Sequence, residues 1–227
     1  MSVEPNEANS IAVFDFDKTL ISVDSGTVFV TELILQSKIR TALAALAAPL
    51  AAPLLGPPRT RILGISIFLW IGTFGGGPER FEESCRKFAE AFPNRKREWR
   101  VLGKTVEALR THVREGHRVI VVSGSLASLV KLMMKRLFDE DVEVIGSSVK
   151  AFCGGLIGQK HCIGRAKVEM MLAAGVPDRE WGFGYSDSAL DIPLLRRCKR
   201  RFLVNPSART IAAYRKALGD GFEVLRV

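Results

Sequence analysis

The chain has 227 residues, of which 47% are hydrophobic and 25% are charged. This much apolar material can fill a packed core, so the composition excludes an intrinsically disordered chain. The length suits one α/β domain with an insertion, or two small domains sharing a site, and excludes a larger multidomain assembly. The net charge is +9 and the mean hydropathy is +0.13, a combination that points towards anionic surfaces as partners.

The basic charge is concentrated near the carboxyl end of the sequence. Residues 192–227 contain nine Lys or Arg and two acidic residues, and five of the six residues from Arg196 to Arg201 are basic. This cluster predicts an electrostatic contact with anionic lipid, and a solvated loop between a helix and a strand is the alternative. Nucleic acid is not expected as a partner, because no helix-turn-helix, RNA-binding aromatic motif or zinc knuckle accompanies the charge.

Cysteine and histidine usage indicates neither a disulfide framework nor a zinc site. The four cysteines lack Cys-x-x-Cys spacing, and the three histidines are few and scattered in the sequence. The first ten residues, MSVEPNEANS, have no basic residue and no apolar run, so they do not resemble a signal peptide. We therefore expect reduced thiols and residence on the cytoplasmic side.

Strand-like apolar runs alternate with helical patterns over most of the chain, which is typical of a parallel sheet with crossover helices. In chain order the expected elements are strand Ile11–Phe14, a helix from Leu102 closed by Gly116, strand Arg118–Val122, helix Leu126–Phe138, strand Val142–Gly146, a Gly-rich turn region, a helix starting near Lys167, strand Trp181–Tyr185, strand Phe202–Val204, a helix entered through Asn205-Pro206-Ser207 and strand Phe222–Leu225. The sequence thus predicts an α/β fold with a Rossmann-like parallel sheet.

The stretch from about Ser22 to Arg100 breaks this alternation, since it is helical and apolar without a clear strand. It is interpreted as a cap inserted after the first strand, at a strand end where insertions are tolerated. We therefore predict a discontinuous catalytic core of residues 1–21 and 101–227, and a helical, apolar cap of residues 22–100.

The predicted cap contains two stretches without any charged residue, Thr41–Pro58 and Ile62–Pro78. Leucines at positions 43, 46, 50 and 54 follow helical spacing, so one interpretation is that they pack inside the cap. Another is an in-plane or shallowly inserted membrane anchor, with Trp70 as an interfacial aromatic residue. A full crossing is disfavoured, because a span needs about 20 apolar residues and two prolines interrupt the first stretch.

Reactive side chains follow the ends of the predicted strands or lie at the start of a helix. They are Asp15, Asp17, Ser123, Lys167, Asp187 and Asp191. Because the carboxyl ends of parallel strands meet at one edge of a sheet, we expect these side chains to lie close together. Crowded carboxylates need a divalent cation, and oxygen ligands without His or Cys favour Mg²⁺.

These residue types suit the transfer of a phosphoryl group. Asp15 can act as a nucleophile that forms an aspartyl-phosphate, and Asp17, two residues on, as general acid and base. The hydroxyl and N–H groups of Ser123-Gly124-Ser125, at the start of a helix, are expected to cradle phosphate oxygens. Lys167 supplies positive charge. Asp187 would complete the metal shell, and Asp191 would orient a metal-bound water or Lys167.

Four segments in this order resemble the motifs of the haloacid dehalogenase superfamily, and most of all its phosphoserine-phosphatase-like branch. They are DFDKTL (15–20), VVSGS (121–125), CIGRAK (162–167) and GYSDSALDIPLL (184–195). The resemblance implies that Asp15 is the nucleophile and a Mg²⁺ ligand, and that Asp17 is the acid/base and a ligand through its carbonyl. It also implies that Ser123 and Lys167 bind phosphate, that Asp187 binds Mg²⁺ and that Asp191 supports the site.

The GYSDS segment and the Ala/Leu/Pro-rich stretch leading to FLWIGTFG (68–75) are similar to the bacterial phosphatidylglycerophosphatase C family. This similarity implies hydrolysis of phosphatidylglycerol phosphate at the cytoplasmic face of the bacterial inner membrane. The residues themselves leave two alternative functions open. One is a soluble cytoplasmic phosphatase for a small metabolite such as phosphoserine, and the other is a non-enzymatic basic protein that binds membranes or nucleic acid. The sequence does not indicate the oligomeric state.

Overall fold

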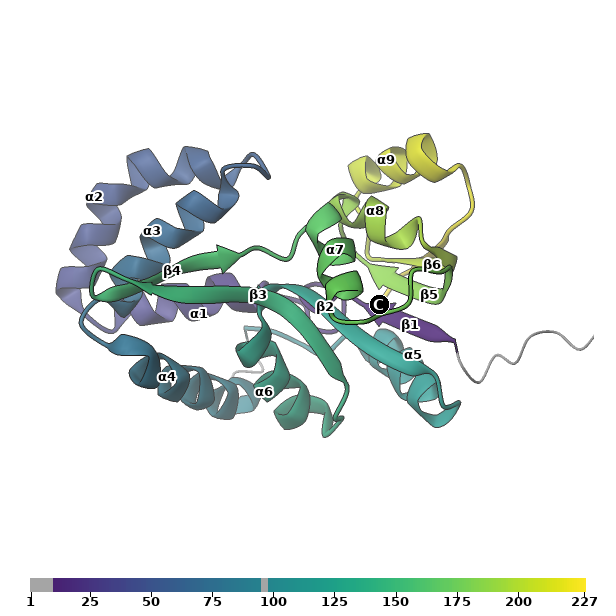
Figure 1. Cartoon of the computed structure of the whole chain (residues 1–227), viewed down its shortest axis with the longest axis horizontal. Coiled ribbons are helices and arrows are strands. Elements are labelled where there is room, and N and C mark those ends of the chain that lie inside the picture. The colour runs from purple at the N-terminus through teal and green to yellow at the C-terminus, as the bar shows by residue number, and fades with distance from the viewer. Residues whose placement is uncertain (1–9, 95–97) are drawn as a thin grey trace, which may run out of the picture.

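The computed structural model describes residues 10–94 and 98–227, which form one seven-stranded sheet and the helices around it (Figure 1). The strand order is β4-β3-β2-β1-β5-β6-β7, and every neighbouring pair is parallel except β3 with β4. The strands are β1 (Ile11–Phe14), β2 (Arg118–Leu126), β3 (Glu143–Phe152), β4 (Gly155–Lys160), β5 (Trp181–Ser186), β6 (Cys198–Val204) and β7 (Glu223–Leu225). The predicted α/β fold with a Rossmann-like sheet is confirmed.

Helices lie on both faces of the sheet and at one end of it (Figure 1). They are α1 (Ser25–Leu35), α2 (Lys38–Leu55), α3 (Arg61–Thr73), α4 (Gly77–Ala91), η2 (Phe92–Asn94), α5 (Gly103–Arg114), α6 (Ala127–Phe138), α7 (Arg165–Ala173), η3 (Ala189–Asp191), α8 (Ile192–Leu195) and α9 (Ala208–Leu218). The central strand β1 is buried on both faces: Ala12 and Phe14 pack on the side of α5 and α6, and Ile11 and Val13 on the side of α7, α8 and α9.

Helices α1 to α4 follow β1 and precede α5, as the sequence predicts for residues 22–100, although the domain limits themselves stay a prediction. The chain enters and leaves this helical region through two segments that lie side by side. The Ser22 N–H donates to the carbonyl of Arg100 at 2.9 Å, and the Leu102 N–H donates to that of Leu20 at 2.9 Å. These paired segments form a stem between the sheet and the helices.

The prediction of a Gly-rich turn region after residue 146 is wrong. Strand β3 continues to Phe152, and the chain then reverses into the antiparallel strand β4. Glycines permit this hairpin to lie against α3. A Cβ on Gly155 would come within 2.7 Å of the Trp70 ring, and one on Gly158 within 2.9 Å of the Ile62 side chain. The Trp70 indole N–H donates to the Phe152 carbonyl at 3.1 Å, so this indole faces the hairpin.

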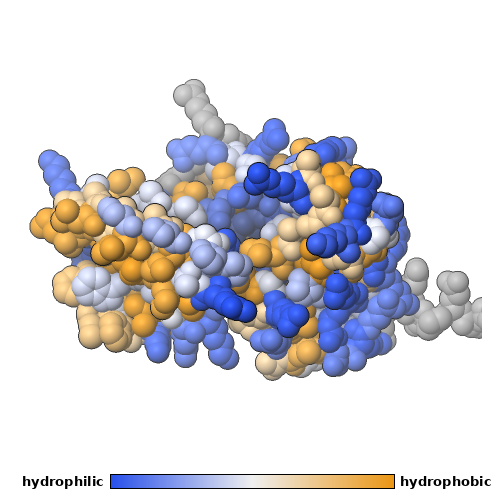
Figure 2. Space-filling model, turned by 90° about the horizontal axis from the view of Figure 1, so that it is seen from above, coloured by the Kyte–Doolittle hydropathy of each residue, from blue (hydrophilic) through white to orange (hydrophobic). Residues whose placement is uncertain are grey.

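The apolar face of α2 lies in solvent. Leu43, Leu46 and Leu50 are 46%, 76% and 78% exposed, and Ile39, one turn before them, is 75% exposed. The expectation that this leucine stripe packs inside the helical region is therefore wrong for these three residues. Figure 2 shows hydrophobic residues gathered at the end of the molecule that α2 and α3 form. We call Ile39, Leu43, Leu46 and Leu50 the α2 stripe.

The basic cluster from Arg196 to Arg201 lies largely in β6 and not in a loop, which corrects that alternative. Arg197 pairs with Asp178, Arg200 pairs with Glu223 at 3.2 Å, and the guanidinium of Arg200 lies over the rings of Phe183 and Phe202. Ion pairs and the aromatic contacts of the Arg200 guanidinium thus accommodate a strongly charged sequence in and beside this strand. In Figure 1, β6 and α2 lie at opposite ends of the molecule, so the cluster and the α2 stripe do not form one continuous patch.

Two of the three histidines meet at the turn between α5 and β2. The Nδ1 atoms of His112 and His117 are 2.7 Å apart, and both side chains are buried. The expectation that the histidines are scattered is therefore wrong for this pair.

Candidate active site

The turn after β1 places two aspartates at the carboxyl edge of the sheet. The main-chain N–H of Asp15 donates to the Tyr185 carbonyl at 2.9 Å, which fixes this residue against the end of β5. Lys18 then adopts a left-handed conformation with φ of 57°, and the Leu20 N–H donates to the Phe16 carbonyl at 2.8 Å. The chain therefore reverses tightly, and Asp15 and Asp17 both line the same cavity.

Asp15 is part of a buried ion-pair network. The Nζ of Lys167 lies 2.7 Å from Oδ1 of Asp15 and 2.7 Å from Oδ2 of Asp191. The Ser186 hydroxyl donates to the same Asp191 oxygen at 2.7 Å, and the Thr19 hydroxyl donates to Oδ2 of Asp15 at 3.4 Å. The side chains of Asp15, Lys167 and Asp191 are 8% exposed or less, so one buried cation serves two buried carboxylates.

Burial and the excess of carboxylates over positive charge shift the pKa values of the network. Burial raises the pKa of Asp15 well above its usual range, and Asp191 and Asp187 raise it further, whereas Lys167 lowers it. Burial alone would lower the pKa of Lys167, but its contacts with Asp15 and Asp191 outweigh burial and raise that pKa. Lys167 therefore stays charged at neutral pH, and additional positive charge near Asp15 would stabilise its ionised form.

Asp17 accepts hydrogen bonds on both carboxylate oxygens. Its Oδ1 accepts the Ser25 N–H at 2.7 Å, and its Oδ2 accepts the hydroxyls of Ser125 at 2.6 Å and Ser123 at 3.2 Å. Burial raises the pKa of Asp17, with a contribution from Asp24, and the bonds from Ser125 and Ser25 oppose the rise. The side chain is thus held in one orientation while its pKa moves towards the range useful for proton transfer.

The donor set fits a divalent cation with oxygen ligands. Asp187 is half-buried, and burial together with the Asp191 carboxylate raises its pKa to about 6. Asp187 is close enough to Asp15 to raise the pKa of Asp15. The positive charge of Lys167 is already shared between Asp15 and Asp191. Mg²⁺ bound by Asp15, Asp187 and the Asp17 carbonyl would relieve this repulsion.

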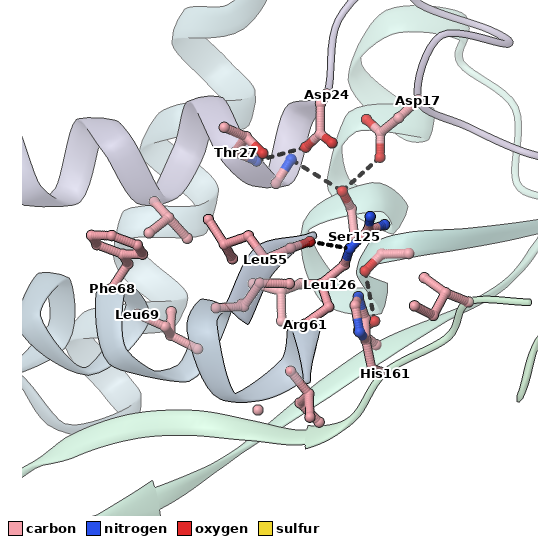
Figure 3. Close-up of a pocket in the computed structure, with 18 of the residues that line it drawn as sticks. Asp17, Asp24, Thr27, Leu55, Arg61, Phe68, Leu69, Ser125, Leu126 and His161 are labelled. Carbon is pink, nitrogen blue, oxygen red and sulfur yellow. Dashed lines mark hydrogen bonds between the residues drawn. The ribbon is translucent and has the colours of Figure 1, made fainter. Parts of the chain in front are cut away.

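The candidate residues surround a cavity of about 770 Å³ (Figure 3). Asp15, Asp17, Gly124, Lys167, Asp187 and Asp191 line it. Ser123 is the exception among the predicted residues, because it is fully buried, does not line the cavity and directs its hydroxyl to Asp17. Ser123-Gly124-Ser125 also do not begin a helix as expected: β2 continues to Leu126, and α6 starts at Ala127.

Sequence reasoning missed Ser125 as a separate functional candidate. Its hydroxyl lines the cavity, donates to Asp17 and accepts the Gly26 N–H at 3.0 Å, so it joins β2 to the start of α1. Strand periodicity could have identified it, because Ser123 and Ser125 lie two residues apart at the end of one strand. Arg61 and His161, which also line the cavity, belong to no motif and could not be found in this way.

The far end of the cavity is apolar. Helices α1, α2 and α3 supply Val30, Ile34, Leu35, Ala44, Leu55, Ile62, Ile65, Phe68 and Leu69 to its wall. Figure 3 places Phe68 and Leu69 at one end and Asp17, Ser125 and His161 at the other, with Arg61 between them. A bound molecule that fills the cavity must therefore have a polar end and an apolar end.

Solved structures with the same fold include enzymes that act on phosphate esters. A protein of unknown function from Bordetella pertussis Tohama I superposes with a TM-score of 0.67 at 20% identity, covering 96% of this chain and 98% of that one. A substrate-bound phosphoserine phosphatase gives 0.57 at 14% identity, with 95% and 92% covered. Cytosolic 5′-nucleotidase IIIB bound to cytidine gives 0.58 at 17% identity, with 97% and 80% covered. At these identities the likeness shows a shared fold.

The family itself is established by the sequence match. Residues 12–196 match the haloacid dehalogenase-like hydrolase family, a range that includes Asp15, Lys167 and Asp187. The chain therefore belongs to the family of haloacid dehalogenase-like hydrolases.

Proposed function

We propose that this hydrolase is a Mg²⁺-dependent phosphomonoesterase that forms an aspartyl-phosphate on Asp15, and that its substrate is phosphatidylglycerol phosphate presented at a membrane surface. The observation that carries the proposal is the cavity that joins the carboxylate and lysine network to an apolar compartment beside the exposed α2 stripe. A small metabolite would use the polar end alone.

The reaction follows from the contacts of Asp15 and Asp17. An oxygen of Asp15 attacks the phosphorus atom, and the bond from phosphorus to the leaving oxygen breaks as Asp17 donates a proton to that oxygen. A water then attacks the phosphorus of the aspartyl-phosphate, Asp17 takes a proton from it, and Asp15 is released as a carboxylate. Lys167, 2.7 Å from Asp15, keeps positive charge beside the phosphoryl oxygens. Mg²⁺, when bound, supplies further neutralisation of their charge.

The boundary between the polar and apolar ends of the cavity supports a substrate with a second anionic group. Arg61 is held there because its Nε donates to the Leu55 carbonyl at 2.8 Å, and Lys160 and His161 line the same part of the wall. Nδ1 of His161 is buried and has no hydrogen-bond partner among the described residues. Burial and nearby Arg61 lower the pKa of His161 to about 4, so its ring is neutral at pH 7. These groups suit the phosphodiester and glycerol oxygens of the proposed headgroup.

The α2 stripe supports a membrane surface as the source of the substrate. Helix α2 is 18 residues long with a mean hydropathy of 1.3, is 11% buried, and is long and apolar enough by composition to enter a membrane. The four residues of the α2 stripe recur at intervals of four, three and four residues, which places them on one helix face. We infer that this face lies in the lipid interface, parallel to the surface, beside the apolar end of the cavity.

Phosphate release tests the catalytic part of the proposal. Purified protein with Mg²⁺ is assayed on phosphatidylglycerol phosphate in mixed micelles, on phosphoserine and on a nucleoside monophosphate. We expect the lipid to have by far the highest kcat/KM and Asp15→Asn to release no phosphate from any of the three. Higher kcat/KM for a soluble substrate would support the small-metabolite alternative, and an unaffected Asp15→Asn variant would exclude the mechanism.

Vesicle flotation tests the membrane part separately. Wild-type protein is expected to float with anionic vesicles, whereas the double variant Leu46→Glu and Leu50→Glu is expected to remain at the bottom. Val224→Glu is the matched control, because Val224 is 41% exposed but lies in β7, outside the stripe. Equal flotation of the double variant and the wild type would contradict the proposed surface.

A further inference from the structure

We propose that His112, Glu115 and His117 form a zinc site at the turn between α5 and β2, outside the cavity of the candidate active site. The ligand atoms are Nδ1 of each histidine and a carboxylate oxygen of Glu115, and a water would complete the shell. Within residues 10–94 and 98–227, this is the one group in which three such side-chain atoms lie within 4.8 Å of one another.

The turn between α5 and β2 builds the cluster. Glu115 caps α5, and its N–H donates to the carbonyl of Thr111 at 2.9 Å. Gly116 follows with φ of +74°, a left-handed conformation that reverses the chain at little cost for glycine. The His117 N–H then donates to the His112 carbonyl at 3.0 Å. The backbone therefore fixes the two imidazoles beside each other, with Glu115 between them in sequence.

The distances between the three ligand atoms match the size of a zinc ion. The two Nδ1 atoms are 2.7 Å apart, and the Glu115 Oε2 is 3.8 Å from that of His112 and 3.6 Å from that of His117. A triangle with these sides has a circumscribed circle with a radius of about 2.0 Å, which is the usual length of Zn–N and Zn–O bonds. One position in the plane of the three atoms is thus about equally distant, at bonding length, from all of them. A tetrahedral ion would require the two Nδ1 atoms, now at hydrogen-bond distance, to move apart to roughly 3.3 Å.

The surroundings of the cluster suit neutral imidazole ligands. Nε2 of His112 lies 3.0 Å from the Tyr185 hydroxyl, which can accept its proton when Nδ1 binds a metal, and such a partner is typical of zinc-bound histidine. Burial, with His117 and Arg200, lowers the pKa of His112 to about 4, so the ring is neutral at pH 7. The charge of Arg200 is itself paired with Glu223 at 3.2 Å.

The cluster is accessible from solvent and does not line the cavity, and Tyr185 connects it to the catalytic residues: its hydroxyl lies near His112, and its carbonyl accepts the Asp15 N–H. The Glu115 side chain is 53% exposed, so an ion can reach the buried nitrogens from the solvent side. His117 immediately precedes β2, and Ser123 lies near its other end, roughly 20 Å away at the rise of a strand. A zinc ion here would fasten the end of α5 to the start of β2 and would contact no substrate.

Calorimetric titration of the full chain with ZnCl₂ tests the site. The protein carries no histidine tag, is freed of metal by chelation, and is kept in excess Mg²⁺ so that the catalytic carboxylates are occupied. We expect one equivalent of Zn²⁺ to bind, and the affinity to fall at least about tenfold in both His117→Gln and Glu115→Gln. Co²⁺ should show the visible absorption of a tetrahedral nitrogen and oxygen site in the wild type and lose it in both variants.

Two control variants locate the bound ion. His161→Gln and Asp187→Asn are expected to bind Zn²⁺ as the wild type does, since these residues lie at the cavity and not at the α5–β2 turn. Glu115→Gln changes an exposed side chain, so it keeps the test decisive even where His117→Gln fails to fold. Absence of Zn²⁺ binding by the wild type, unchanged affinity in Glu115→Gln, or loss of binding in Asp187→Asn would overturn the proposal.

Discussion

The carboxyl edge of the sheet and the α2–α3 hairpin distribute polar and apolar side chains in opposite ways. At the sheet edge, Asp15, Lys167 and Asp191 are buried and bonded to one another. On the hairpin, leucines such as Leu46 and Leu50 lie in solvent. Both arrangements cost stability in water, because buried charge loses hydration and exposed apolar surface orders water. The proposed function gives each arrangement a partner: a phosphate and a cation at the edge, and an apolar phase at the hairpin.

The largest expected effect concerns the nucleophile at the sheet edge. Asp15→Asn should lower kcat for phosphate release by roughly three orders of magnitude or more, because the amide cannot form the acyl phosphate. The fold should persist, since Lys167 keeps its ion pair with Asp191 at 2.7 Å. Steady-state kinetics with a soluble aryl phosphate, alongside circular dichroism, measure both. Activity within tenfold of the wild type would mean that Asp15 is not the nucleophile.

Removing the positive charge of Lys167 tests how much stability the protein gains from charge balance at the sheet edge. Lys167→Met leaves Asp15 and Asp191 buried without a counter-charge, and should reduce the free energy of unfolding by about 3–5 kcal/mol in the absence of Mg²⁺. Urea denaturation measures the change. Arg86→Met, which removes an exposed pair with Glu83, is the matched control and should change stability by less than about 1 kcal/mol. Equal effects of the two variants would contradict the described network.

Leucines on the inner and outer faces of the hairpin should respond differently to truncation. Leu69 in α3 is 2% exposed, so Leu69→Ala should cost about 2–4 kcal/mol of unfolding free energy. Leu50 in α2 is 78% exposed, and Leu50→Ala should change it by less than about 0.5 kcal/mol. Chemical denaturation of both proteins without lipid gives the comparison. A large cost at Leu50 would indicate that the stripe is packed in solution.

The last expected effect is pH-dependent and lies outside both regions. Folded His112 stays neutral down to about pH 4, while the unfolded histidine takes up a proton near pH 6.5, so the unfolded state binds more protons between these values. Stability should therefore fall by roughly 2 kcal/mol as the pH falls through this window. Urea denaturation across pH, with a chelator present, should show this loss in the wild type and a smaller one in His112→Leu. Parallel curves would show that His112 is not the group responsible.

Much of the sheet could be predicted from the sequence because buried strands and helix caps have local signatures. Strand β1 was predicted with its observed limits, and Ser207 caps α9 by accepting the Thr210 N–H. Strand β4 was missed because Gly155 and Gly158 weaken the strand pattern. These glycines leave space for the side chains of α3, a role that only the folded structure reveals. The early start of β6 was hidden by its basic residues, of which Arg200 lies over the rings of Phe183 in β5 and Phe202 in β6 itself.

The candidate site was predictable where a reactive residue type directly follows a predicted strand or begins a predicted helix. Asp15, Lys167 and Asp187 line one cavity as expected. The hydroxyl of Ser123 was expected to face phosphate, yet it donates to Asp17, and which way a hydroxyl turns depends on neighbours that a sequence does not place. Spacing also could not tell that the leucines of α2 face outward, because an apolar face has the same period whether it contacts protein or lipid.

The hairpin of β3 and β4 has a mechanical consequence for the helical region. Strand β3 is hydrogen-bonded to β2 in the sheet, and its distal half, paired with β4, reaches α3. Together with the paired segments around Ser22 and Arg100 and the hydrogen bond from Gly26 to Ser125, it anchors the helices to the sheet at three separate places. A body held at several places cannot swing freely about one hinge. Any widening of the cavity mouth must then twist the β-ribbon, whose stiffness would set the energy of opening.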